Sequence, residues 1–320
     1  MKNNIEIIEY NKKDEMKIEE MINKIFLETK NGFEYVKQIP DKSVNLILTD
    51  PPYLINYAEW DKEDWSFTEQ WVKECFRILK DDGSFYSFMG WQHSAEFKLL
   101  LDKFGMIKNW IIWERSKGRS SKINYKSIRE DIFYYVKTKE FIFNEQKKLR
   151  PVIAPYKNED GTPKGWFINE EGERVRWTGV GNIWHFTPPN WSSKLDRQVH
   201  PTQKPIALLE RIINASSNKN DIILDPFIGS GSTAVACKRL NRNFIGMEIY
   251  QNYIDISYKR LSEVKQGEGL IPQEPKTIVE PIILETTTSE IIKKGRGRPK
   301  GSKNKAKIIE PDLFTINKDK

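Results

Sequence analysis

Short apolar runs alternate with amphipathic segments through most of the chain. Residues 43–50 contain a run of strand-forming apolar side chains, which is typical of a parallel strand covered on both faces. Residues 66–80 carry apolar side chains at helical spacing, and Ser66 with Glu69 three residues later predicts the N-cap of that helix. The two patterns together predict a strand followed by a helix.

The same alternation continues on both sides of this pair. Strands that alternate with helices favour an α/β fold, here a doubly wound and mostly parallel sheet. The pattern predicts strands at residues 24–28, 84–89, 109–114, 131–136, 140–143, 222–224 and 243–248, helices at residues 93–103, 206–216 and 232–240, and a turn at Asp82-Gly83.

The alternation breaks between residues 115 and 194, where a basic run precedes a part rich in Gly, Pro and Trp. A solvated face would explain the cations, and a local core would explain the tryptophans. A second interpretation is an insert that sets specificity, in which cations meet phosphates and aromatic side chains meet bases. The cations, with no acid between them, are Arg115, Lys117, Arg119, Lys122, Lys126 and Arg129.

Composition excludes several classes of protein. No apolar run approaches the roughly 18 residues of a membrane span, and the first residues lack the apolar core of a signal peptide. Two cysteines and three scattered histidines in 320 residues predict neither a disulfide framework nor a metal centre. We therefore expect a cytoplasmic protein that works without a metal ion.

The net charge of +7 is located in one short segment near the carboxyl end. Residues 293–307 contain eight cations and no acid, so the rest of the chain is nearly balanced. From residue 266 onward the composition and lack of periodicity are typical of a linker. Within it, residues 295–305 resemble an AT-hook, whose arginines can lie in a narrow A·T minor groove, and a generic basic tail is the alternative.

The strand at residues 43–50 ends in Asp50-Pro51-Pro52-Tyr53. Each proline fixes its own φ and donates no backbone hydrogen bond, and a residue before proline is held extended. The corner therefore presents a carboxylate, free carbonyl groups and an aromatic ring. A plain strand-ending turn is the alternative, but these four residues directly after an apolar strand favour a functional site.

A second corner follows the strand at residues 222–224. It reads Asp225-Pro-Phe-Ile-Gly-Ser-Gly-Ser-Thr233, and its two glycines allow a tight turn and the close approach of a ligand. The next helix directs its N-terminal amides to the strand ends, and Glu248 ends the following strand, where an acid commonly binds ribose hydroxyls. The stretch lacks the Lys of a Walker loop and the third glycine of the dinucleotide fingerprint, so it favours a nucleoside without an extended pyrophosphate.

Ligands of doubly wound sheets bind at the carboxyl ends of strands near a switch point, so both corners can face one cleft. One corner offers backbone and ribose contacts, and the other offers a hydrogen-bond acceptor and a stacking ring. Together they predict a site that presents a planar amine to a nucleoside cofactor.

These motifs resemble those of the amino-methyltransferases that act on adenine N6 or cytosine N4 in DNA. Asp50-Pro-Pro-Tyr53 resembles their catalytic motif, and the Asp225 corner resembles their S-adenosylmethionine motif. His200-Pro-Thr-Gln-Lys-Pro205 resembles the segment that helps to enclose the cofactor. The order of motifs is that of the family's β group, over about residues 24–262. One departure is Thr29-Lys-Asn31-Gly32, where many relatives carry Gly-Asp at an accessory contact.

The resemblance implies a Rossmann-like methyltransferase fold and the transfer of a methyl group from S-adenosylmethionine to a base flipped out of double-stranded DNA. An Asp at the first motif position favours adenine N6 over cytosine N4. The catalytic residues implied are Asp50, Pro51, Pro52 and Tyr53. The cofactor-binding residues implied are His200, Thr202, Lys204, Asp225, Pro226, Phe227, Gly229, Ser230, Gly231, Ser232, Thr233 and Glu248. The DNA-binding residues expected are Arg115, Lys117, Arg119, Lys122, Arg296, Arg298 and Lys300.

The chain then divides into a catalytic and cofactor-binding domain (1–114 and 195–265), a target-recognition insert (115–194), and a linker with a basic tail (266–320). A bacterial or phage source, a homodimer and a cognate restriction nuclease are compatible with the resemblance, and no membrane partner is expected. Two other functions stay open: methylation of a side-chain amide or RNA base, and a catalytically silent DNA-binding protein. The basic segments favour DNA, and the intact corners argue against a silent protein.

Overall fold

The computed structural model describes residues 6–9, 24–29, 32–115, 122–190, 200 and 202–269. All of them belong to one compact unit, Met1–Thr277. Several predicted DNA-binding residues lie outside the described residues, and so does the whole AT-hook-like segment. These residues are Lys117, Arg119, Arg296, Arg298 and Lys300.

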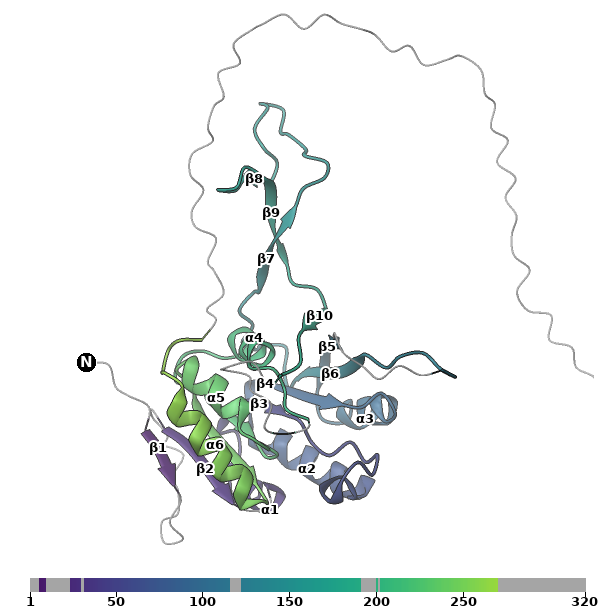
Figure 1. Cartoon of the computed structure of the whole chain (residues 1–320), viewed down its shortest axis with the longest axis vertical. Helices are drawn as coiled ribbons and strands as arrows, with labels where there is room; N and C mark the ends of the chain where they lie inside the picture. Colours follow the sequence, from purple (N-terminus) through teal and green to yellow (C-terminus); the bar gives the residue numbers. More distant parts are fainter. Residues whose placement is uncertain are drawn as a thin grey trace, which may run out of the picture. The chain divides into compact units, whose positions relative to one another are not determined.

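A nine-stranded sheet forms the centre of the described residues (Figure 1). Across the sheet the order is β1-β2-β12-β11-β3-β4-β6-β5-β10. All neighbours pair in parallel except β6, which runs antiparallel to β4 and β5. The predicted doubly wound, mostly parallel sheet is therefore confirmed. The strands are β1 (Glu6–Glu9), β2 (Lys24–Thr29), β3 (Val44–Thr49), β4 (Leu79–Met89), β5 (Met106–Arg115), β6 (Arg129–Val136), β10 (Ile183–Phe186), β11 (Ile222–Asp225) and β12 (Asn243–Glu248).

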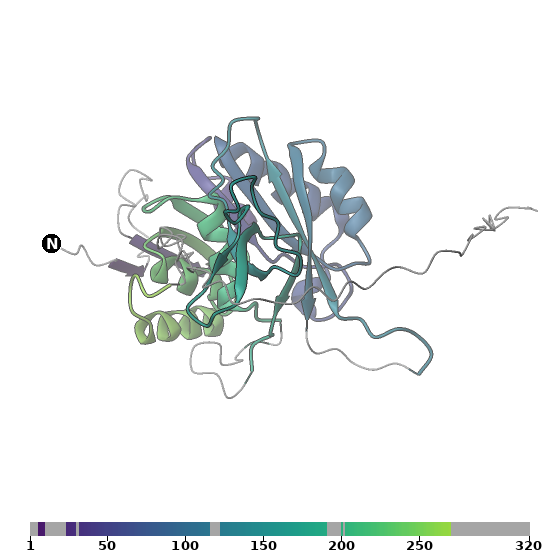
Figure 2. The same cartoon turned by 90° about the horizontal axis from the view of Figure 1, so that it is seen from above.

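Helices cover both faces of this sheet, green on one side and blue on the other (Figure 2). Side chains of β3 contact both layers of helices. Leu46 and Leu48 pack with one layer, and Ile47 between them packs with the other. Val44, on the far side of a register shift, also packs with the second layer. None of the described helices is long and apolar enough to cross a membrane. The first layer contains α4 (Ile206–Ser216), α5 (Ser232–Arg239) and α6 (Gln251–Glu263), and the second contains α1 (Gly32–Val36), α2 (Trp65–Ile78) and α3 (Ser94–Leu101).

The direction of winding reverses between β3 and β11. After β3 the chain passes through α2 to β4 on one side, and after β11 it passes through α5 to β12 on the other side. The two strands pair directly, with Leu46 opposite Ile223. Asp50 and Asp225 therefore stand at neighbouring strand ends, at the switch point where open α/β sheets bind ligands.

The predicted turn at Asp82-Gly83 is wrong. β4 begins at Leu79 and runs through both residues. Val44 of β3 pairs with Leu79, and Leu46 pairs with Ser84, so a register shift accommodates the additional residues of β4. A Cβ at Gly83 would lie 2.9 Å from the Asn45 carbonyl oxygen. The glycine therefore serves close packing inside a strand and does not mark a turn.

Two other local predictions are also corrected. Residues 140–143 form no strand, because single backbone bonds such as Ile142 N–H to the Asp82 carbonyl replace a ladder. The N-cap of α2 is Asp64 and not Ser66: the Asp64 carboxylate accepts the Phe67 N–H at 3.0 Å. Either residue type suits an N-cap, so the sequence alone does not choose between them.

The segment predicted as an insert divides between two sheets. β6 and β10 belong to the nine-stranded sheet, whereas β7 (Lys147–Pro151), β9 (Arg174–Gly179) and β8 (Phe167–Ile168) form a separate antiparallel sheet. The predicted range 115–194 thus includes two strands of the main sheet. The reason is that β6 turns back between β4 and β5, which a simple strand–helix alternation does not signal.

Candidate active site

One cavity of about 480 Å³ lies at the carboxyl ends of β3 and β11. This volume is within the range of small-molecule sites, roughly 300 to 1,000 Å³. Every predicted catalytic residue lines it, and so does every predicted cofactor-binding residue except Gly231. The fold therefore brings the two corners, far apart in sequence, to a single cavity. Other lining residues include Trp60, Asp61, Phe88, Trp113, Arg115, Glu130 and Tyr253.

Asp50 is the acceptor at the first corner, with 22% of its side chain exposed. The Tyr53 hydroxyl donates to Oδ1 at 2.7 Å, and Lys204 Nζ donates to Oδ2. Burial raises the pKa of Asp50 above its usual range, and the Lys204 ammonium counteracts this only in part. A carboxyl group with a raised pKa is a stronger proton acceptor than an ordinary one.

The loop after Tyr53 is held by one buried carboxylate, that of Asp61, whose residue is only 1% exposed. It accepts backbone N–H bonds from Leu54, Ile55 and Tyr57 at 2.8, 3.0 and 2.9 Å. Leu54 has a positive φ of 59°, which is strained for a residue with a side chain. Asp61 therefore stabilises a strained loop that lines the cavity beside Tyr53.

Asp225 at the second corner is 2% exposed, and its hydrogen-bond donors belong to the protein. The hydroxyls of Thr49 and Thr233 each donate at 2.8 Å, and the Phe227 N–H donates at 3.1 Å. Burial raises the pKa of Asp225 to about 7 in spite of these bonds. The carboxylate thus joins the ends of two strands to the first turn of α5 and shapes the loop between β11 and α5, and its predicted contact with the cofactor stays a prediction.

The loop between β11 and α5 turns at two glycines. Gly229 and Gly231 have φ values of 50° and 78°, and a Cβ on Gly231 would lie 2.5 Å from Ser257 Oγ. Arg260 of α6 holds the loop from the other side, because its Nη1 donates to the Ser230 carbonyl oxygen at 2.6 Å. The N-terminal amides of α5 consequently lie beside the cavity, where they favour electron-rich groups.

Glu248 and Phe227, two of the predicted cofactor-binding residues, line the same cavity. Glu248 Oε2 accepts the Gly229 N–H at 3.1 Å, and Oε1 accepts the Tyr250 N–H at 3.0 Å. Each carboxylate oxygen can accept more than one bond, so both keep capacity for ribose hydroxyls. The Phe227 ring is held edge-on by Trp71, with 5.5 Å between centroids, and lines the same cavity.

His200, Thr202 and Lys204 line the cavity from a third segment. The His200 Nδ1 lies 3.0 Å from Thr202 Oγ1, and its ring meets Tyr253 edge-on with 4.6 Å between centroids. Burial lowers the pKa of His200 to about 4, so the ring is neutral near pH 7. Within this cavity the Lys204 ammonium donates to the Asp50 carboxylate at the catalytic corner.

Glu130 is a residue of the site that the sequence did not reveal. Its Oε2 lies 3.3 Å from the Tyr53 hydroxyl and 3.4 Å from Lys204 Nζ, and its Oε1 lies 2.9 Å from Arg115 Nη1. Because β6 runs antiparallel to β4, the start of β6 lies beside the end of β4, at the same edge as Asp50. The two adjacent acids near the start of this strand, Glu130 and Asp131, are the local signal, and they do not indicate this placement.

Arg115 and Lys122 are the predicted DNA-binding residues that the structure describes. Arg115 pairs with Glu130 and lines the cavity, so it takes part in the site's own charge balance. Lys122 is exposed in the segment between β5 and β6, near Ile123 and Tyr125, whose side chains are 98% and 96% exposed. This segment therefore offers cationic and aromatic groups to a partner.

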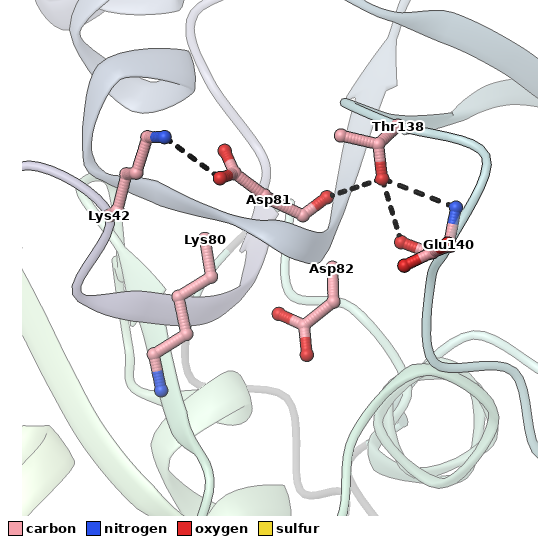
Figure 3. Close-up of a pocket in the computed structure, with 6 residues that line it drawn as sticks. All are labelled: Lys42, Lys80, Asp81, Asp82, Thr138 and Glu140. Carbon is pink, nitrogen blue, oxygen red and sulfur yellow. Dashed lines mark hydrogen bonds and ion pairs between the residues drawn. The ribbon is translucent and has the colours of Figure 1, made fainter.

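A second hollow of about 340 Å³ lies at the amino ends of β3 and β4, away from both corners. Four of its lining residues bond to one another: Lys42 Nζ donates to Asp81 Oδ2 at 2.8 Å, and the Thr138 hydroxyl donates to the Asp81 and Glu140 carbonyl oxygens (Figure 3). No group of described residues has the ligands to hold a metal ion. The cavity at the switch point is therefore the candidate active site.

Comparison with known proteins gives this geometry a family. A family model described as DNA methylase matches residues 44–259. The chain belongs to this DNA methylase family. It is 34% identical over 267 residues to the Type II methyltransferase M.HpaI of Haemophilus parainfluenzae, which covers 79% of this chain and 80% of that relative. It is 36% identical over 245 residues to the DNA adenine methyltransferase YhdJ of Escherichia coli (strain K12), covering 71% of this chain and 79% of the relative.

A solved structure of this kind is the M1.HpyAVI–SAM complex, with a TM-score of 0.53 and 28% identity over 74% of this chain and 98% of that one. The DNA methylase is thus an S-adenosylmethionine-dependent DNA methyltransferase, as predicted. Its cavity suits that cofactor, because an aromatic ring, an acid and the amides of a glycine loop surround one space of nucleoside size.

Proposed function

We propose that this DNA methylase methylates N6 of adenine at a specific site in double-stranded DNA. The observation that carries the proposal is the shared cavity, in which an acceptor corner at Asp50 faces a cofactor corner at Asp225. Adenine is favoured by the 36% identity to a relative named as an adenine methyltransferase and by the Asp at position 50. Cytosine N4 is the alternative.

The Asp50 carboxylate and the Pro51 carbonyl oxygen are the proposed acceptors for the target amine. An exocyclic amine is a poor nucleophile because its lone pair is delocalised into the ring. Two hydrogen bonds to these acceptors favour a more pyramidal nitrogen and orient its lone pair, which is catalysis by positioning and electrostatics. S-adenosylmethionine supplies a methyl group on a positively charged sulfur. The nitrogen gains positive charge on methylation, and Asp50 is placed to accept the proton it then loses.

Tyr53 is the proposed platform for the flipped base, since a base inside the duplex cannot reach such a cavity. The phenol ring packs against the backbone of Gly90, where a Cβ would lie 3.1 Å from Tyr53 Cδ2. Its hydroxyl is held by Asp50 at 2.7 Å. A ring fixed at its face and at its hydroxyl can stack on a base without first being ordered.

The cofactor side is assigned to three kinds of group. The Glu248 carboxylate would hold the ribose hydroxyls, the Phe227 ring would contact the adenine ring, and the glycine loop would receive the rest of the cofactor. The neutral His200 and Thr202 lie on the facing wall. Asp225 acts through the loop that its three hydrogen bonds stabilise.

Target recognition is assigned to residues 147–179 together with the segment that contains Lys122. Residues 147–179 contain seven cations and five acids. Val175 is the one buried apolar side chain among them, whereas Ile153 and Tyr156 are 98% and 72% exposed. A three-stranded sheet with both faces exposed has little core of its own. Contact with DNA would cover these side chains and pair the cations with phosphates.

The basic tail is the proposed source of additional, weakly specific affinity for DNA. Arg296, Arg298 and Lys300 would contact an A·T-rich minor groove, and this affinity should fall steeply with salt. Deletion of residues 290–320 should weaken DNA binding without changing the methylated site, and an altered site would contradict this role. A cytoplasmic location, a homodimer and a cognate restriction nuclease stay predictions.

Digestion of labelled substrates tests the proposed function. The protein is incubated with methyl-labelled S-adenosylmethionine and DNA, RNA or protein, and the methylated residue is identified by mass spectrometry. N6-methyladenine in DNA is expected. N4-methylcytosine in DNA would mean that the target base is cytosine. Label confined to RNA or protein would overturn the proposal. Asp50→Ala should abolish incorporation, and Asp82→Ala, which removes an exposed acid at the other end of the sheet, should not.

A further inference from the structure

Both oxygens of Asp50 already have donors from the protein. The Tyr53 hydroxyl donates to Oδ1 at 2.7 Å, and the Lys204 ammonium donates to Oδ2. A target amine that donates to Asp50 must therefore compete with at least one of these two groups. Neither donor can simply be withdrawn, because a buried polar group without a partner is costly and a buried charge is costlier still.

The same two donors share a second acceptor, Glu130. Its Oε2 lies 3.3 Å from the Tyr53 hydroxyl and 3.4 Å from Lys204 Nζ. Both distances are at the long end of hydrogen-bonding and ion-pair contact, so a small movement would shorten them to full bonds. Tyr53 and Lys204 are thus each placed between two carboxylates.

Glu130 is held in place independently of these donors. Its Oε1 pairs with Arg115 Nη1 at 2.9 Å, and it stands in β6 directly opposite Trp113 of β5. Lys204, in contrast, has a side chain that is only 7% exposed and lies 4.9 Å from the Phe88 ring centroid. In such surroundings the ammonium needs a carboxylate partner whichever group occupies Asp50.

We propose that Glu130 is a positioning residue of the methyl-transfer site: it takes over Lys204 and the Tyr53 hydroxyl when the target amine binds Asp50. This inference rests on the proposed role of Asp50 as the acceptor for the amine. The exchange keeps the site balanced, because Asp50 and Glu130 face Lys204 and Arg115 throughout. It also gives a role to the contact between Lys204 and the catalytic corner.

The proposal predicts a dependence on pH that a merely structural carboxylate would not produce. Burial raises the pKa of Asp50 first, Lys204 lowers it, and the negative charge of Glu130 raises it again. Removing that charge should therefore lower the pKa of Asp50 and move the acid limb of kcat to lower pH. The charged or titratable groups that face this pair are Tyr53, Arg115, His200, Lys204 and Asp225.

The first test is Glu130→Gln, assayed with unmethylated double-stranded DNA of mixed sequence. We expect kcat to fall roughly 10²-fold, the size that misplaced reacting groups cost, with the KM for S-adenosylmethionine nearly unchanged. The acid limb should move to lower pH, and an NMR titration of the Asp50 carboxyl in the free protein should show the same shift. A variant with the kcat and acid limb of the wild type would overturn the proposal.

A double-mutant cycle with Lys204→Met tests the exchange itself. Without Lys204, Asp50 Oδ2 lacks its protein donor and can accept the target amine while Tyr53 stays bonded to Oδ1. Glu130 then has no donor that it must take over. Glu130→Gln should then cost less than about threefold in the Lys204→Met background, against roughly 10²-fold alone. If Glu130→Gln lowers kcat by the same factor with and without Lys204, the exchange is refuted.

Two further variants keep the result interpretable. Glu114→Gln removes an acid from neighbouring β5 that pairs with His185 and does not line the cavity, and it should behave as the wild type. If Glu130→Gln does not fold, Glu130→Asp decides: a retained acid limb with a lowered kcat supports the proposal, and an unchanged kcat opposes it. Wild-type protein that methylates no adenine would refute the proposed function instead.

Discussion

Asp50 and Asp225 end neighbouring strands in the same Asp-Pro-aromatic setting, but their carboxylates have different surroundings. Asp50 is 22% exposed at its side chain, and its donors, Tyr53 and Lys204, each have Glu130 as a second acceptor. Asp225 is 2% exposed, and its donors are two short threonine hydroxyls and a backbone amide. The first set of donors can exchange for a substrate, and the second cannot. The difference supports the proposed reacting role of Asp50 and the proposed supporting role of Asp225.

The largest expected effect is that of Asp50→Asn on turnover. The substitution removes the charged acceptor for the target amine, and we expect kcat to fall roughly 10²- to 10³-fold, as when a preorganised electrostatic contact is lost. The melting temperature should change little, because Tyr53 and Lys204 can turn to Glu130. Kinetics and thermal unfolding on the same preparation check both parts. Retained turnover, or a collapse in stability, would remove the contrast between the two corners.

Asp225→Ala should show the opposite pattern. It leaves the hydroxyls of Thr49 and Thr233 and the Phe227 N–H buried without their acceptor, which should cost about 2–4 kcal/mol of unfolding free energy. Binding of S-adenosylmethionine should weaken because the glycine loop loses its anchor. Urea unfolding and calorimetric titration measure the two effects. Unchanged stability together with a lost kcat would mean that Asp225 takes part in the reaction directly.

The two corners themselves could be predicted from local sequence, because each depends on residues adjacent in the chain, but the contrast between their carboxylates could not. Apolar runs located β3 and β11, prolines located the corners, and the glycines located the turn into α5. The errors arose where tertiary packing decides the outcome. Gly83 is accommodated in β4 by a register shift, and residues 140–143 meet β4 through an isolated backbone bond, from Ile142 N–H to the Asp82 carbonyl oxygen, and form no ladder.

Glu130 and Lys204 show what local sequence could not reveal. Lys204 belongs to a motif that points to the cofactor, yet the fold carries its ammonium to Asp50, 154 residues away in sequence. Glu130 reaches the same place because β6 runs antiparallel within an otherwise mostly parallel sheet. Neither contact follows from spacing or periodicity, because both depend on which strand end lies beside which.

A smaller effect is expected for Asp61→Ala, which tests how far the Asp50 corner depends on its own loop. The variant loses three backbone hydrogen bonds and releases the strained Leu54, so unfolding free energy should fall by about 1–3 kcal/mol. The KM for DNA should rise several-fold, by roughly 1 kcal/mol of binding, while Tyr53 keeps its contact with Asp50. Steady-state kinetics compare this variant with Glu96→Ala, which removes an exposed acid of α3 that does not line the cavity. Equal KM values would show that the loop does not contribute to binding.

The last expected effects are in the pH dependence of stability, and they have opposite signs at the two sites. The pKa of His200 in the folded protein is about 4, below its ordinary 6.5. Its contribution to the free energy of unfolding is therefore complete above pH 6.5 and is lost as pH falls toward 4. The pKa of Asp225 in the folded protein is about 7, above its ordinary 3.8. Its contribution to the free energy of unfolding is therefore complete below pH 3.8 and is lost as pH rises through 7. Urea unfolding of the wild type, His200→Gln and Asp225→Asn between pH 4 and 8 should show that His200→Gln reduces the loss of stability on the acid side. The stability advantage of the wild type over Asp225→Asn should grow as pH falls from 8 to 4. If the stability difference between wild type and Asp225→Asn is the same at every pH, the Asp225 carboxyl stays ionised from pH 4 to 8 and its pKa is not raised.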